Sequence, residues 1–284
     1  MMQQAAIQAA FVAACTEELA APKPGNVHVH ADGHGMTVAD FVRSAQAAAP
    51  ELCRHGAALG ERILSAVVAT RTAVGQNTNL GIVLLAAPLV MAAERPDRDL
   101  HAALRRVLDE ANLADTEAAF RAIRHAAPTG LRHAPRHDVH GPADVTLAAA
   151  MAAAADRDSI ARQWATGFAD ILGPGMQAYL DARARWPDPA WAPLAAYLWF
   201  LAAFPDSHIL RKHGPAAAER TRQDAVPVRQ RVLAEPDPSV TLPELLEWDR
   251  DLKARGINPG TSADLTVATI LAYRLRHGDE QRPE

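Results

Sequence analysis

Cysteine is scarce in this sequence, whose 284 residues contain only Cys15 and Cys53 and no C-x-x-C pair. Two isolated cysteines argue against a disulfide framework and against a zinc ribbon, because both need several closely spaced sulfur atoms. Free cysteines in folded proteins are usually buried, small hydrophobic side chains. We therefore expect both thiols to be buried and unreactive.

Aromatic residues are also few, at 5% of the chain, although 49% of the residues are hydrophobic. The core must then be filled mainly by Ala, Leu and Val. Alanine-rich segments favour helix, because alanine loses no side-chain entropy when a helix forms. The composition therefore points to a helical globular protein with a substantial core.

Long hydrophobic runs are absent as well. The most apolar stretch, residues 80–93, is shorter than the ~20 residues that span a bilayer, and the N-terminus lacks the basic flank of a signal peptide. The net charge of −4 gives no overall attraction to nucleic acid or to an anionic membrane. These features predict a cytoplasmic protein with neither partner, in which any bound anion is held by a local positive site.

Several common catalytic motifs are missing too. The sequence has no G-x-S-x-G, no H-E-x-x-H and no dinucleotide-binding glycine fingerprint, which argues against a serine hydrolase, a zincin and a dehydrogenase. The polar segment at 75–81 does not end in Gly-Lys-Ser/Thr, so it is not a P-loop.

Helical spacing of apolar residues dominates what is present. Ile7, Phe11, Cys15 and Leu19 recur every four residues and mark one buried face of a helix that the prolines of residues 22–24 end. No alternating run of strand length occurs, so we predict an all-α fold in a single compact multi-helix domain over residues 1–284. Further helices are expected in segments of apolar periodicity, alanine richness or clear caps: 52–67, 80–93 with a kink or break at Pro88, 143–155, 190–204, 241–256 and 261–278.

Five polar segments interrupt these helices, and the first two flank apolar helices. Residues 22–28 present Lys23, Asn26 and His28 on a backbone restrained by two prolines, which suits either a phosphate-binding loop or a plain helix stop. Residues 75–81 place Asn77 and Asn79 before the most apolar helix. They suit either a helix cap or an anion site, since a helix N-terminus attracts negative charge.

The third segment, residues 132–141, combines two arginines with three histidines and Asp138. Its His-x-x-His spacing with Asp138 and His133 permits a transition-metal site, while the same cations equally suit a phosphate chain. Asp138 and His140 are also candidates for a catalytic base.

The fourth and fifth segments are rich in groups that bind phosphate or Mg²⁺. Residues 205–214 contain Asp206 and His208 together with the adjacent cations Arg211 and Lys212. Residues 256–265 form a Gly- and Pro-shaped turn, followed by the cap candidates Thr261 and Ser262 and by Asp264. Capping and a solvated helix end explain both segments nearly as well.

Taken in order, these motifs resemble the triphosphoribosyl-dephospho-CoA synthase family, the transferases that make the precursor of the prosthetic group of citrate lyase and malonate decarboxylase. The elements that carry the resemblance are Pro22-Lys23-Pro24-Gly25, Asn77-Thr78-Asn79 to Gly81, Asp206-Ser207-His208 to Gly214, and Asn258-Pro259-Gly260-Thr261-Ser262-Ala263-Asp264-Leu265. Two segments, Asn26-Val27-His28 and Asn79-Leu80, differ from the usual sequence pattern of this family. In these differences the chain resembles a divergent branch of the family that is found in archaea and in one-carbon-metabolising bacteria.

The resemblance implies that the 2′-hydroxyl of dephospho-CoA attacks C1 of the ATP ribose and that adenine leaves. It also implies an expected Mg²⁺, with ATP as a substrate. On this basis the phosphate contacts are assigned by residue type to the cations Lys23, Arg211 and Lys212. The ribose or phosphate contacts are assigned to the polar residues Asn26, His28, Asn77, Asn79, His208 and Ser262. Asp206 and Asp264 are expected to bind Mg²⁺, or one of them to act as the base.

Two alternatives follow from the same residues. A related ribosyl or phosphoryl transferase could act on another acceptor in one-carbon, methanopterin-type cofactor biosynthesis. A non-catalytic helical module could bind a nucleotide without turnover. A homo-oligomer is compatible with each of these three functions.

Overall fold

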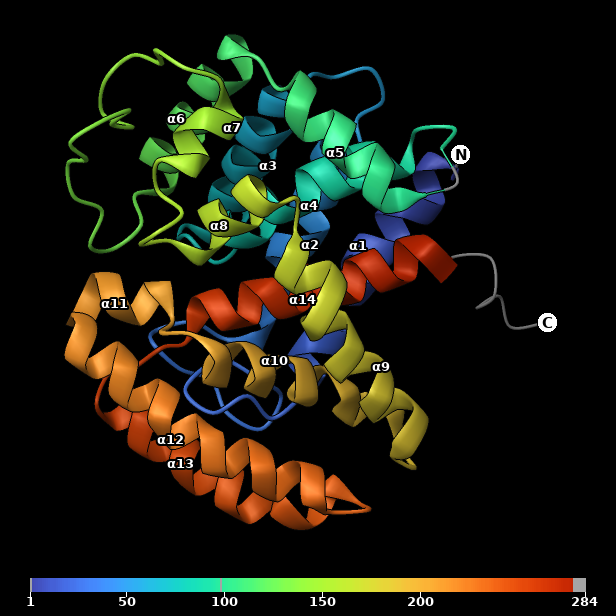
Figure 1. Cartoon of the computed structure of the whole chain (residues 1–284), viewed down its shortest axis with the longest axis vertical. Coiled ribbons are helices and arrows are strands. Elements are labelled where there is room, and N and C mark those ends of the chain that lie inside the picture. The colour runs from blue at the N-terminus through green and yellow to red at the C-terminus, as the bar shows by residue number, and fades with distance from the viewer. Residues whose placement is uncertain (1, 98, 278–284) are drawn as a thin grey trace.

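Helices follow one another along almost the whole chain (Figure 1). In the computed structural model, residues 2–97 and 99–277 are described, and within these ranges the only β-type pairing is two isolated bridges, His28–Ala31 and Gly33–Met36. The prediction of an all-α fold is confirmed. The helices are α1 (Gln4–Ala20), α2 (Val38–Leu52), α3 (Leu59–Val74), α4 (Leu80–Ala93), α5 (Leu100–Glu110), α6 (Leu113–Ala126), α7 (Leu147–Ala152), α8 (Ser159–Thr166), η1 (Ile171–Gly175), α9 (Met176–Arg185), η2 (Pro189–Trp191), α10 (Ala192–Ala203), α11 (Ser207–His213), α12 (Pro215–Ala234), η3 (Pro238–Thr241), α13 (Leu242–Ala254) and α14 (Gly260–His277).

The last helix, α14, lies at the centre of the molecule. In Figure 1 it crosses the middle of the view, with α2–α8 on one side and α9–α13 on the other. It packs against α1, α4 and α10 and also touches α8, α9 and α11. Most of its side chains are buried, because neighbouring helices cover it on several sides. The C-terminal segment is therefore part of the core of the fold.

The apolar helix α4 is buried on nearly every side, as its composition predicts. The expected break at Pro88 is wrong, because α4 continues through this residue. Proline leaves the carbonyl four residues earlier, that of Leu84, without its helical partner. Trp164 Nε1 of α8 donates to the Leu84 oxygen at 3.2 Å, so the helix keeps a satisfied backbone at the proline.

Three helix boundaries differ from the sequence predictions. Leu52 ends α2 and Leu59 begins α3, so the apolar residues of 52–67 belong to two helices. The alanine-rich helix expected over 143–155 covers only α7, where the Thr146 side chain caps the first turn. The last helix begins at Gly260, so Thr261 and Ser262 lie in its first turn and do not cap it.

Both cysteines are buried and free, as expected. Burial raises the pKa of Cys53 to about 12 and raises the pKa of Cys15 further, so neither thiol ionises readily. None of the helices described is long and apolar enough to cross a membrane.

Candidate active site

A single large pocket collects residues from all five polar segments. Its volume is about 1170 Å³, above the ~300–1,000 Å³ typical of a site for one small ligand. Eight of the residues proposed from the sequence line it: Asn26, Asn77, Asn79, Asp138, His208, Arg211, Lys212 and Asp264. These residues come from segments that are up to 238 positions apart in the chain, from Asn26 to Asp264.

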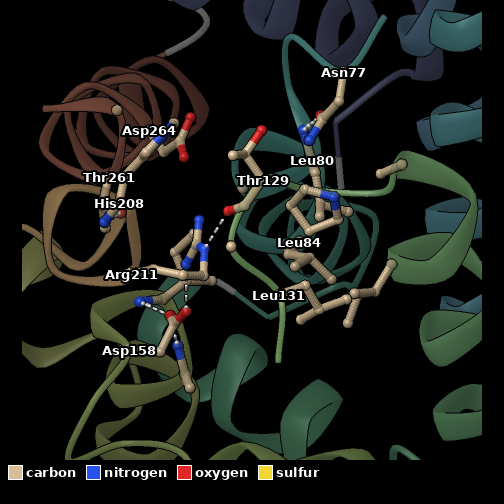
Figure 2. Close-up of a pocket in the computed structure, with 18 of the residues that line it drawn as sticks. Asn77, Leu80, Leu84, Thr129, Leu131, Asp158, His208, Arg211, Thr261 and Asp264 are labelled. Carbon is tan, nitrogen blue, oxygen red and sulfur yellow. Dashed lines mark hydrogen bonds and ion pairs between the residues drawn. The ribbon is translucent and has the colours of Figure 1, made fainter. Parts of the chain in front are cut away.

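Asp264 is the lining carboxylate with the most unusual surroundings. Figure 2 shows its side chain on α14 pointing into the pocket. A Cβ atom built on Gly81, at the start of α4, would lie 2.1 Å from Asp264 Oδ2, so the carboxylate sits directly against that glycine. No hydrogen bond to Asp264 is present among the described residues. Burial, reinforced by the charges of Asp206 and Glu18, raises the pKa of Asp264 well above its usual range.

Asp206 has a different environment, although it was grouped with Asp264 in the sequence. It is buried and does not line the pocket. Its Oδ1 caps α11 by accepting from the backbone N–H groups of His208 and Ile209 at 2.9 and 3.1 Å. Its Oδ2 accepts from the N–H and hydroxyl of Ser262 at 2.7 and 2.8 Å. Both oxygens are occupied, so Asp206 joins α11 to α14, and Ser262 is the other half of this joint.

Lys23 also lies outside the pocket lining, fully buried. Its Nζ is 2.5 Å from Glu18 Oε1 and donates to the Val27 carbonyl at 2.9 Å and to Asn26 Oδ1 at 3.3 Å. Glu18, by contrast, lines the pocket. Lys23 therefore holds the loop and a pocket carboxylate in place, and its ammonium group is not presented to the cavity.

His28 is buried against α13 and does not line the pocket. Its Nδ1 accepts from the His30 N–H at 3.3 Å, and its Nε2 lies 3.4 Å from Asp249 Oδ1. Burial lowers the pKa of His28, which favours the neutral ring. The Asp249 carboxylate also accepts from Gly25 N at 2.8 Å, so this contact anchors the proline-containing loop.

The cations of α11 face the pocket from the side of Asp264. Arg211 donates to the Thr129 carbonyl at 3.3 Å and lies 3.5 Å from Asp158 Oδ2 (Figure 2). Lys212 is exposed, with its Nζ 3.5 Å from the Gly256 oxygen. Burial, helped by Arg211 and Lys212, lowers the pKa of His208 to about 4, so this ring is neutral near pH 7.

The asparagines before α4 line the opposite part of the pocket. Asn77 Oδ1 accepts from Leu80 N at 3.1 Å, which satisfies one of the free donors at the helix N-terminus. The Nδ2 of Asn79 is buried and has no partner within the described structure. An unpaired buried amide is costly unless a ligand completes it. Asn79 is therefore a good candidate to donate to a bound substrate.

The third segment forms one wall of the pocket through Arg132, Arg136 and Asp138. Asp138 accepts from the Nδ1 atoms of His133 and His140 at 2.6 and 2.8 Å and from the His140 backbone N–H at 3.0 Å. These donors hold the pKa of Asp138 well below its usual range, so it is a weak base. His140 itself is exposed and does not line the cavity.

The pocket carries positive charge although the chain as a whole is negative. Its cationic lining residues are Arg71, Arg132, Arg136, Arg157, Arg211 and Lys212. The lining also contains apolar residues, and Figure 2 shows Leu80, Leu84 and Leu131 together across the pocket from Asp264. The cations suit a polyphosphate and the leucines a base or an alkyl chain.

Sequence reasoning missed four of the charged lining residues: Glu18, Arg71, Arg157 and Asp158. Each lies in an ordinary-looking helix or just before the start of one, so no loop motif marks it. Only the pairing of Glu18 with Lys23, five residues later, offered a signal, since the two occur at the end of one helix and the start of its loop.

The family model for ATP:dephospho-CoA triphosphoribosyl transferases matches residues 4–283. This chain belongs to that family. It is therefore a transferase, its family uses ATP as a substrate, and the resemblance noted in the sequence is confirmed. No curated protein sequence gives a significant match.

The fold agrees with this assignment. A crystal structure from Archaeoglobus fulgidus, described as that of a candidate triphosphoribosyl-dephospho-CoA synthase, superposes with a TM-score of 0.66 at 25% sequence identity. The match covers 82% of this chain and 97% of the other. The family and this structure together indicate triphosphoribosyl-dephospho-CoA synthase activity.

Proposed function

We propose that the pocket binds ATP and dephospho-CoA together and transfers the triphosphoribosyl group of ATP to the 2′-hydroxyl of dephospho-CoA. In this reaction a bond forms between the acceptor oxygen and C1 of the ribose, and the hydroxyl proton goes to a base. The bond from C1 to adenine breaks, and adenine leaves with the electron pair and takes up a proton from solvent. The triphosphate remains intact.

The observation that carries the proposal is the pairing of Asp264 with a cationic region in one large cavity. A carboxylate without a protein partner and with a raised pKa is a stronger base than an ordinary aspartate. Two other lining candidates, Asp138 and His208, are poorer bases because their pKa values are lowered. Glu18 also lines the pocket with a raised pKa, but it is paired with the ammonium group of Lys23. We therefore assign to Asp264 the acceptance of the 2′-hydroxyl proton.

The triphosphate is assigned to Arg211 and Lys212 of α11 and to Arg132 and Arg136 of the loop at residues 132–141. Asn79 is assigned to donate to a ribose or phosphate oxygen. Three residues have positioning roles and do not contact the substrate. Asp206 and Ser262 position α11 against α14, and Lys23 positions Glu18. These positioning roles replace the direct substrate contacts expected from residue type.

Mg²⁺ fits the donors of this pocket, since it prefers carboxylate oxygens together with substrate phosphates. Asp158 and Glu18, which line the cavity with Asp264, would hold it. When bound, Mg²⁺ would neutralise charge on the triphosphate.

The test is to incubate the purified protein with ATP, Mg²⁺ and dephospho-CoA and to separate the products by chromatography with mass detection. We expect free adenine and a product heavier than dephospho-CoA by the triphosphoribosyl group, both dependent on the acceptor. ADP or AMP without adenine would instead indicate phosphoryl transfer and would contradict the proposal. If ATP binds but dephospho-CoA yields nothing, other hydroxyl acceptors become the substrates to test.

A further inference from the structure

One histidine cluster has no part in this mechanism. His133 and His140 converge on Asp138 in the long connection between α6 and α7, which loops out beyond these helices in Figure 1. One ligand atom from each of the three residues lies within 4.8 Å of the others. The two imidazole rings are 4.5 Å apart between centroids.

We propose that His133, Asp138 and His140 form a binding site for a transition-metal ion of the zinc class on the wall of the pocket. Two imidazole nitrogens and one carboxylate oxygen are a common ligand set for Zn²⁺ sites that keep a position open. Mg²⁺, by contrast, prefers an all-oxygen set, so this site and the proposed magnesium site differ in chemistry. Metal binding here is independent of the transferase function proposed above.

The ligand atoms are already assembled. Asp138 places one oxygen 2.6 Å from His133 Nδ1 and the other 2.8 Å from His140 Nδ1, so each contact holds a single shared hydrogen. When a metal ion binds, the proton of each neutral imidazole moves from Nδ1 to Nε2 by exchange with water, and the freed Nδ1 becomes a ligand. No redox step is involved, and the remaining coordination positions are filled by water or another oxygen ligand.

The backbone behind the ligands is fixed to α6. Arg124 donates to the carbonyl oxygens of Val139 and Gly141, the latter at 3.4 Å, and pairs with Glu117 at 3.2 Å. Glu117 in turn accepts from Ala143 N at 3.1 Å. The loop therefore brings its ligands together before any metal binds, which reduces the ordering entropy that binding has to overcome.

The site is also accessible. The His133 side chain is 82% exposed and that of His140 37%, while Asp138 and His133 line the pocket. An ion can thus enter from solvent, and its open positions lie at the edge of the cavity.

The neighbouring His137 provides a matched control. It lies in the same loop and also contacts a carboxylate, with its Nδ1 2.8 Å from Asp144 Oδ1, but it does not belong to the cluster. The chain has 12 histidines, so a comparison within this loop is needed to separate the site from scattered binding.

The experiment is to strip the full-length protein with a chelator and to titrate it with Zn²⁺ by calorimetry and with Co²⁺ by visible absorption. We expect one ion per chain in the wild type and in His137→Ala. Binding should be at least about tenfold weaker in the double variant His133→Ala/His140→Ala, because two of the three ligands are lost. His140→Gln, which keeps the size of the side chain, should show the same weakening to a smaller degree. Equal binding by the wild type and the double variant, or no binding by the wild type, overturns the proposal.

A second readout uses trypsin, which cleaves after Arg132 and Arg136 in this loop. Zn²⁺ should slow cleavage at these two bonds several-fold in the wild type and in His137→Ala, and leave the rate unchanged in the double variant. Protection that is equal in all three proteins would show that zinc acts elsewhere and would count against the site.

Discussion

At the scale of single residues, this protein keeps a partly buried carboxylate without a protein partner among the described residues. Asp264 lies on α14, lines the pocket and packs directly against Gly81. Such a charge is costly for stability, because burial disfavours the ionised form. Sites of this kind persist where function requires them, so stability and activity should respond in opposite directions when the carboxylate is removed.

Asp264→Asn should therefore raise stability at neutral pH and lower turnover. The folded-state pKa of Asp264 is above its unfolded value, so the ionised group destabilises the protein as pH rises past that unfolded value. We expect a gain in the free energy of unfolding at pH 7 that disappears near pH 4, and a loss of about 100-fold or more in adenine release. Thermal unfolding at several pH values and the product assay measure both.

Asp224→Asn, an exposed acid on α12, is the control and should change neither quantity. Binding of ATP with Mg²⁺ to Asp264→Asn separates two roles for the carboxylate. Retained affinity fits a base, whereas lost affinity would reassign Asp264 to the metal.

His208 gives a second prediction at this scale. Its pKa is lowered to about 4, mainly by burial, whereas an unfolded histidine titrates near pH 6.5. Between these values the unfolded state binds more protons, so stability falls as the pH is lowered through this window. Relative to His208→Gln, the wild type should lose up to about 1.4 kcal/mol per pH unit there. Urea unfolding of both proteins from pH 4.5 to 8 tests this, and parallel profiles would contradict it.

At the scale of elements, the pocket depends on how α11 and α14 are held together. Asp206 caps α11 and at the same time binds the first turn of α14 through Ser262. The side chain that fixes one helix start thus sets the position of the other. Arg211 and Asp264 lie on these two helices, so their mutual placement follows from this joint.

Asp206→Ala should lower the free energy of unfolding far more than the loss of an ordinary helix cap does. It removes the acceptor of four donors, of which the His208 N–H keeps a second acceptor in Thr261 Oγ1. The other three are left without a partner in a buried region, at a cost of about 3 kcal/mol or more. Asp99→Ala, which removes an exposed cap of α5, should cost only about 1 kcal/mol. Denaturant unfolding compares the two, and similar costs would contradict the role of Asp206. Ser262→Ala, which loses one hydrogen bond, serves if Asp206→Ala fails to fold.

At the scale of the whole molecule, the pocket lies between parts of the chain that are distant in sequence. Its lining includes residues from the first helix, the segment before α4, the loop after α6, helices α7, α8 and α11, and the start of α14. A ligand that fills it should stabilise all of these together, because binding to the folded state alone shifts the folding equilibrium.

ATP with Mg²⁺ should accordingly raise the free energy of unfolding by about 2.7 kcal/mol at a concentration 100 times its Kd. Hydrogen exchange should slow in residues 76–84, 129–138, 208–213 and 258–264 at once. The C-terminal end of α12 and the N-terminal end of α13, which lie away from the pocket, provide an internal control, and we expect no protection there. Protection confined to one segment would mean that the nucleotide does not occupy the pocket as a whole.

The sequence by itself determined the helical class, the burial of α4 and of both cysteines, and the five polar segments that carry the family resemblance. These follow from local composition and periodicity, which act over a few residues. The predictions of helix ends were less accurate. The carbonyl of Leu84, which loses its helical partner at Pro88 of α4, accepts from Trp164, and this residue lies 76 positions beyond Pro88 in the chain.

Only the tertiary structure decided which polar residues face the pocket. Lys23 and Asp206 look like ligands in the sequence, yet their charges are matched by buried partners, Glu18 and Ser262. Asp264 has the same residue type as Asp206 and no such partner among the described residues. The physical reason is that burial and hydrogen bonding, which set whether a charged group is available, depend on neighbours that the chain brings together only on folding.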